Sequence, residues 1–145
     1  MRLPEAEVVS AWVEITQERI LRFAEATEDR QWIHLDAERA ASESPYRTTV
    51  AHGFLTLSLL PHLLREAVRI EGVAMGVNYG LNRVRFIAPV PAGSRIRGRF
   101  VVASTEQAGA ATRVTWNVTV ECDAAARPCC VAEWVTMYYA GAAQE

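Results

Sequence analysis

The chain has 145 residues, of which 50% are hydrophobic and 22% are charged, and its formal net charge at pH 7 is −2. This length and balance predict one globular domain over residues 1–145, large enough to bury its own core. A nearly neutral chain is not typical of a general binder of nucleic acid or of anionic membrane surfaces. Its first residues lack the charged, apolar and small-residue pattern of a secretory signal, so we expect a cytoplasmic protein.

The three cysteines are Cys122, Cys129 and Cys130. An odd number, with two of the three adjacent, does not suit a disulfide framework. The chain has no Cys-x-x-Cys spacing, and a structural zinc site needs about four ligands. We therefore expect buried, reduced thiols and no metal site.

The first third of the chain predicts a strand followed by helices. Apolar and polar residues alternate at its start, and Thr16 with Glu18 is typical of a helix N-terminus. The expected elements are a strand over 9–15, a helix over Gln17–Thr27, an irregular turn over 28–34, a short helix from Asp36 to Ala41 and a loop over 42–49.

The stretch Ala51–Arg65 contains no acidic residue and carries apolar side chains on nearly every face. Such a pattern predicts a buried helix. The stretch is shorter than the ~20 apolar residues that cross a bilayer. Pro61 removes the N–H that would bond to Leu57, so we expect a kink there.

The remainder of the chain alternates with the period of strands, and its turns carry glycine and proline. The expected strands cover 75–86, with a bulge near Asn82–Arg83, and then 95–102, 113–122 and 131–139, followed by a short tail over 141–145. The fold class is therefore α+β, an antiparallel sheet curled around one helix. A second copy would cover the sheet edges, so we expect at least a dimer.

Three residues combine into a candidate active site. Asp29 and His34 lie five residues apart, and a carboxylate with an imidazole can hold a water and move its protons. Gly53, at the start of the central helix, offers a free N–H to an oxygen on which negative charge develops. Together they suit the addition or loss of water at a carbon β to a carbonyl. An Asp near a His is also common in ordinary turns, so the spacing alone leaves both interpretations open.

Two segments, Thr27–Asp36 with Ala40-Ala41 and Val50–Leu59, resemble the MaoC-type (R)-specific enoyl-CoA hydratases. The Gln31-Trp32-Ile33-His34 variant is closest to the branch named after nodulation protein N. Both halves of the motif occur in order at the family's separation. The similarity continues through Asn82–Phe86 and Pro89-Val90, so that it covers roughly residues 15–95.

The resemblance implies a hotdog fold, a curled sheet around a long helix, with dimers joined edge to edge. It also implies that Asp29 and His34 activate the water, while the amide of Gly53 polarises a thioester carbonyl. The implied reaction converts a trans-2-enoyl thioester into an (R)-3-hydroxyacyl thioester and back. It needs no metal or redox cofactor, because coenzyme A or acyl carrier protein is part of the substrate.

Further residues near these motifs are candidates for substrate binding. Gln31 and Trp32 depart from the Asn-Pro of many family members, and Trp32 either lines the acyl pocket or packs behind the loop. His52 is either catalytic or orients the loop, and Ser58 either reaches the site or bonds to its own helix. The candidates are Gln31, Trp32, His52, Phe54, Ser58, Arg83 and Arg85.

Arg83 and Arg85, like Arg95, Arg97 and Arg99, alternate along strands. They suit the phosphates of coenzyme A, although such a stripe is also typical of a solvated face.

Two other functions are possible on the same fold. A thioester hydrolase typically carries a carboxylate on the central helix, and Ala51–Arg65 has none. A non-catalytic acyl-thioester-binding protein has no need of both Asp29 and His34.

Overall fold

The computed structural model describes residues 1–141, and it confirms the α+β class. All strands belong to one antiparallel sheet with the order β1-β4-β5-β6-β3, and β2 also pairs with β4. The strands are β1 Val8–Val9, β2 Val13–Glu14, β3 Val73–Phe86, β4 Arg95–Ala108, β5 Ala111–Cys122 and β6 Cys130–Ala140. The helices are α1 Gln17–Thr27, α2 Trp32–Leu35, α3 Ala37–Glu43, α4 Gly53–Ser58 and α5 Leu60–Ala67.

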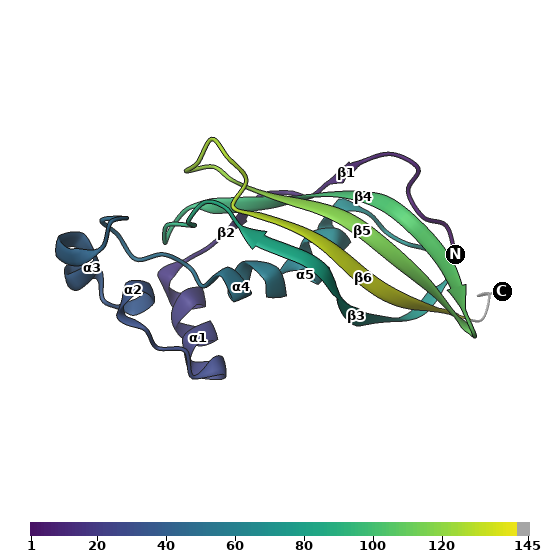
Figure 1. Ribbon diagram of the computed structural model, residues 1–145, viewed down its shortest axis with the longest axis horizontal. Coiled ribbons are helices and arrows are strands. Elements are labelled where there is room, and N and C mark those ends of the chain that lie inside the picture. The colour runs from purple at the N-terminus through teal and green to yellow at the C-terminus, as the bar shows by residue number, and fades with distance from the viewer. Residues whose placement is uncertain (142–145) are drawn as a thin grey trace.

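Helices α4 and α5 lie along one face of the curved sheet, and α1, α2 and α3 gather beyond one end of it (Figure 1). The core lies between the sheet and α5, where Phe100, Trp116, Leu60 and Leu63 are almost fully buried. Phe100 and Trp116 meet edge to face, with ring centroids 6.3 Å apart. The sheet thus supplies the hydrophobic wall against which the central helices are fixed.

The central helix is broken, as its proline predicts. It forms α4 and α5, which meet at Leu59, and Pro61 lies in the first turn of α5, where a missing N–H costs little. The expectation that the helix is buried on every side is wrong for the single chain, because the side chain of Phe54 is 66% exposed. Apolar residues on all faces therefore do not mean that one chain covers them all.

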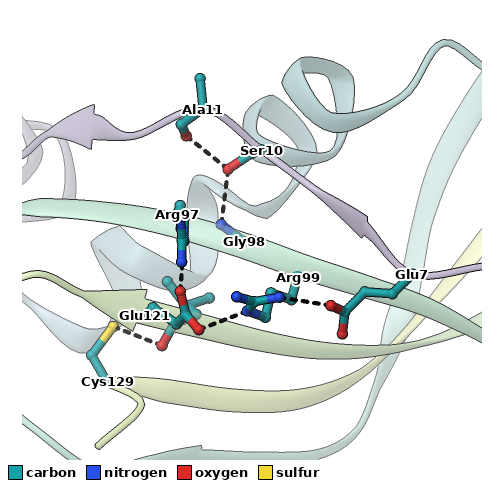
Figure 2. Close-up of polar contacts among 9 residues, drawn as sticks. Glu7, Ser10, Ala11, Arg97, Gly98, Arg99, Glu121 and Cys129 are labelled. Carbon is teal, nitrogen blue, oxygen red and sulfur yellow. Dashed lines mark hydrogen bonds and ion pairs between the residues drawn. The ribbon is translucent and has the colours of Figure 1, made fainter. Parts of the chain in front are cut away.

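The expected strand over 9–15 is wrong as one strand, because it is divided into β1 and β2. The hydroxyl of Ser10 accepts a hydrogen bond from the Gly98 N–H at 2.9 Å and donates one to the Ala11 carbonyl at 2.8 Å (Figure 2). The Ser10 side chain therefore forms hydrogen bonds at the point where backbone pairing with β4 would otherwise continue.

Other predicted boundaries vary in accuracy. Helix α1 has the predicted limits, and the Thr16 hydroxyl accepts a hydrogen bond from the Arg19 N–H, as expected of an N-cap. The carboxylate of Asp36 caps α3, but this helix extends to Glu43 instead of Ala41. The predicted bulge is present as a register shift between Leu81 and Arg83. The predicted tail over 141–145 lies outside the described residues, apart from residue 141.

Strand β3 forms an edge of the sheet and pairs only with β6 among residues 1–141. Its large exposed apolar side chains are Met75, Val77, Tyr79, Leu81 and, at its end, Phe86. An unpaired strand with such side chains is a surface that another chain can cover.

All three cysteines are free and buried. Burial raises the pKa of Cys129 to about 12 and the pKa of Cys130 to about 11. Because the thiolate is the reactive species, we expect a thiol reagent at about pH 8 to modify none of the three in the native protein. Ellman titration should find three thiols only after denaturation. Rapid titration of the native protein would show that β5, β6 and the segment between them open readily.

Candidate active site

The segment between α1 and α3 is more ordered than its sequence predicts. Helix α1 ends at Thr27, its C-cap residue Glu28 turns the chain with a φ of 64°, and Asp29 follows directly. The expectation of an irregular turn over 28–34 is wrong for its second half, because α2 begins at Trp32. The Asp36 N–H bonds to the Trp32 carbonyl at 2.9 Å, so the short helix carries His34 in a defined position.

Two hydrogen bonds hold His34, and a third orients one of its partners. Its Nδ1 lies 2.6 Å from the carbonyl oxygen of Val50, and since a carbonyl only accepts, this nitrogen carries the proton. The amide of Gln17 donates to the His34 carbonyl at 2.8 Å. The hydroxyl of Thr49 donates to Gln17 Oε1 at 2.5 Å. The sequence pattern does not reveal these roles of Gln17, Thr49 and Val50. Gln17 has the pattern of a surface helix residue, and a backbone acceptor such as Val50 leaves no mark in the sequence.

His52 packs directly against His34. The two rings are stacked, with centroids 3.8 Å apart and an interplanar angle of 24°. His52 Nε2 donates to the backbone carbonyl of Asp29 at 2.9 Å. The ring of Phe23 also packs against His52, with ring centroids 4.9 Å apart. These contacts favour the interpretation in which His52 orients the loop of Asp29. Its Nδ1 is buried and has no partner within residues 1–141.

The structure brings three reactive side chains together. One carboxylate oxygen of Asp29 and one nitrogen each of His34 and His52 all lie within 4.8 Å of one another. Asp29 is exposed, whereas His34 and His52 are only 7% and 3% exposed. A water that bonds to two groups at about 2.8 Å each fits this separation. The cluster therefore lies where solvent meets the interior.

Burial lowers the pKa of His34, and the nearby His52 lowers this pKa further. The hydrogen bond to Val50 and the charge of Asp29 oppose these effects without reversing them. His34 is therefore neutral at neutral pH, with its proton on Nδ1 and a lone pair on Nε2. A neutral imidazole in this tautomer is ready to accept a proton.

Gly53 follows His52 directly and is the first residue of α4. Its N–H has no intrahelical acceptor, because the first residues of a helix have none. The segment just before Gly53 is held by the loop between β3 and β4, because the Ala51 N–H donates to the Val90 carbonyl at 2.8 Å. A Cβ at position 53 would lie 2.9 Å from the ring of Phe86, so only glycine fits without displacing that ring.

The other predicted binding residues take different positions. Gln31 is exposed at the N-terminus of α2. Trp32 packs against α3, with the guanidinium of Arg39 4.1 Å from its ring centroid, as expected if it lies behind the loop. The hydroxyl of Ser58 donates to the Phe54 carbonyl at 2.7 Å, within the helix. The ring of Phe54 meets that of Phe86 edge-on at 5.9 Å.

The arginines fall into two groups. Arg97 and Arg99 both bind the carboxylate of Glu121 at 2.6 Å, and Arg99 also binds Glu7 (Figure 2). These hydrogen bonds, led by that from Arg99, lower the pKa of Glu121. Arg95 pairs in the same way with Asp123. This group is thus occupied by ion pairs within the chain.

Arg83 and Arg85 form the second group, near the end of β3 that leads to Phe86. Both are exposed, and Arg85 donates to the carbonyl of its neighbour Val84. No salt bridge to either is found within the described residues.

None of the helices within residues 1–141 is both long and apolar enough to pass through a bilayer.

Comparison with known proteins links this geometry to a family. The model of the MaoC like domain matches residues 2–124. The chain is 51% identical over 132 residues to 3-hydroxyacyl-thioester dehydratase Z of Mycobacterium tuberculosis, which covers 90% of this chain and 87% of the relative. It is 49% identical to nodulation protein N of Rhizobium leguminosarum bv. viciae, over 88% of this chain and 81% of the relative.

Solved structures agree on the fold. R-hydratase PhaJ1 from Pseudomonas aeruginosa superposes with a TM-score of 0.75 at 23% identity, over 94% of this chain and 82% of that chain. The (R)-hydratase from A. caviae gives a TM-score of 0.71 at 20% identity, over 91% and 93%. The hotdog-type fold is therefore confirmed.

Proposed function

The chain belongs to the MaoC-like domain family, and on that premise we propose that it is a hydro-lyase acting on acyl thioesters. It hydrates trans-2-enoyl thioesters to (R)-3-hydroxyacyl thioesters and catalyses the reverse dehydration. One observation carries this proposal: the side chains of Asp29, His34 and His52 converge within 4.8 Å, directly before the helix that starts at Gly53.

The proposed reaction uses each group for one task. The Gly53 N–H binds the thioester carbonyl, and conjugation then makes the β-carbon electrophilic. A water held by Asp29 and His34 bonds through its oxygen to that carbon, while one of its protons passes to the pair. The pair delivers a proton to the α-carbon, so that both side chains return to their starting protonation. His52 does not take part in the proton transfer itself; it positions the loop of Asp29 and the ring of His34.

Coenzyme A or acyl carrier protein enters this proposal as part of the substrate, and no metal or redox cofactor is required. Arg83 and Arg85 are the candidate partners for its phosphates. We also propose a homodimer joined through β3, because the exposed apolar side chains of this strand lie on an unpaired edge. A cytoplasmic location is supported by the three free cysteines.

The proposal is tested with crotonyl-CoA and longer trans-2-enoyl-CoA substrates. Loss of the enoyl absorbance without release of free thiol is the result expected of a hydratase. Thiol release would instead show a hydrolase, for which α4 and the first turn of α5 offer no carboxylate. Neither signal with any chain length would reject both enzymes in favour of an acyl-thioester binder.

The pH dependence of kcat/KM follows from the state of His34. The neutral imidazole is the active form, and its pKa lies below the ordinary value of 6.5. The neutral form therefore persists as the pH falls to 6.5, and kcat/KM should decline only below that pH. A pH–rate profile measures this directly. An acid limb with its midpoint above 6.5 would contradict the proposed role or protonation state of His34.

A further inference from the structure

The imidazole of His34 is carried by a helix that depends on other parts of the chain. Helix α2 spans only four residues, and an isolated helix of this length is not stable in water. The carbonyls of Ile33 and His34 lie in its last turn, where intrahelical donors run out. Both are bonded from outside, because the Val50 N–H donates to the Ile33 carbonyl at 3.1 Å and the Gln17 amide to the His34 carbonyl at 2.8 Å. These external bonds therefore decide where His34 lies.

Gln17 is bound at both ends of its amide group. It is an exposed residue at the start of α1, which lies next to α2 (Figure 1). An exposed glutamine can bond to water, and fixing its side chain costs conformational entropy. Here Nε2 donates to His34, and Oε1 accepts a hydrogen bond at 2.5 Å from the hydroxyl of Thr49, which is only 3% exposed. The amide thus bridges α2 to a buried hydroxyl.

The loop between β3 and β4 anchors this bridge on both sides. The Ala92 N–H donates to the carbonyl of Thr49 at 2.9 Å. The fully buried Ile15, two residues before the glutamine, accepts from the Gly93 N–H at 2.7 Å and donates to the Ser94 carbonyl at 2.8 Å. Three consecutive residues of one loop therefore hold both ends of the bridge in a fixed relation to the sheet.

Resting on the hydratase function proposed above, we propose that Gln17 is a positioning residue for the hydration step. Its amide fixes the backbone of His34 relative to the β3–β4 loop, while the Val50 carbonyl fixes the direction of the imidazole. Together they keep the basic Nε2 within reach of the water that His34 shares with Asp29. Gln17 acts on the reaction only through His34, and Thr49 acts only through Gln17.

The first test is Gln17→Met, which keeps the length of the side chain and removes both hydrogen bonds. We expect kcat for hydration of crotonyl-CoA to fall about tenfold while KM stays within about twofold of wild type, because a misplaced base slows the chemical step more than it weakens binding. Glu18→Met is the matched control in the same helical turn. Glu18 pairs with Arg22 on the exposed face, so this variant should keep the wild-type kcat.

The second test follows the chain of hydrogen bonds to its far end. Thr49→Val removes the hydroxyl at nearly constant shape and should lower kcat by about threefold, whereas Thr49→Ser keeps the hydroxyl and should retain the wild-type rate. The double variant Gln17→Met/Thr49→Val should be no slower than Gln17→Met alone, because both changes break one chain.

The Nδ1 proton of His34 supplies a readout that a general loss of stability does not move. This proton is bonded to the Val50 carbonyl, and its imidazole N–H signal in NMR spectra is identified by its loss in His34→Ala. The chain has only three histidines, which keeps the assignment simple. We expect Gln17→Met to shift or broaden this signal, and Glu18→Met and Thr49→Ser to leave it in place.

Gln17→Glu repeats the test if Gln17→Met does not fold, since a carboxylate accepts from Thr49 but cannot donate to His34. A wild-type kcat in the folded variant, or a lowered kcat with an unchanged His34 signal, would overturn the role of Gln17 and leave the hydratase intact. Absence of hydration by the wild-type protein with every enoyl-CoA would reject the proposed function, and the role of Gln17 with it.

Discussion

Replacing His34 by alanine or Asp29 by asparagine should lower kcat for hydration at least about a hundredfold. His34→Ala removes the basic nitrogen that accepts the proton of the water. Asp29→Asn keeps the size of the side chain and removes its charge. Steady-state hydration of a trans-2-enoyl-CoA measures both effects, and thermal melting of each variant shows whether it is folded.

Matched controls separate chemistry from general damage. His62→Ala removes the remaining histidine, which lies in α5 outside the reactive cluster. Glu28→Gln neutralises the exposed carboxylate next to Asp29, which pairs with Arg30. Both controls should retain activity close to wild type. A near-normal rate in folded Asp29→Asn or His34→Ala would reject the role of that residue.

Removing the N–H of Gly53 should have an effect of similar size. Proline lacks this N–H and is well tolerated at the first position of a helix, which Gly53 occupies. The preceding His52 has a ψ of 136°, which suits a residue before proline. We expect Gly53→Pro to lose about a hundredfold in kcat relative to Gly53→Ala, which keeps the amide.

Both substitutions add a Cβ that would press on the ring of Phe86. They are therefore best compared in a Phe86→Ala background, where the ring is absent and only the N–H and the proline ring distinguish them. Equal kcat in the two double variants would show that the amide of Gly53 does not stabilise the developing charge.

Local patterns predicted several elements well. Helix α1 has the predicted limits because Thr16 caps it through its own side chain. Strand β5 has strict alternation and sits between β4 and β6, with one face in the core, so period and burial agree. The predicted pairing of Asp29, His34 and Gly53 depended mainly on the resemblance of two motifs, since their spacing alone is also typical of a turn.

What the sequence missed depends on long-range contacts. Helix α2 is a single turn, too short for a periodic signal. Gln17 reaches His34 and Thr49 only once α1 is folded against the loop. The binding of Arg97 and Arg99 to Glu121 depends on the register of β4 against β5, which alternation does not specify. The apolar pattern of the central helix likewise did not indicate which of its side chains, such as Phe54, a single chain leaves exposed to solvent.

A structure of His34→Ala crystallised with trans-2-dodecenoyl-CoA is the most direct test of the central claim. We expect the thioester carbonyl oxygen within about 3 Å of the Gly53 nitrogen, with the β-carbon facing Asp29 across the space of one water. A thioester bound away from Gly53, or a β-carbon turned away from Asp29, would contradict the account.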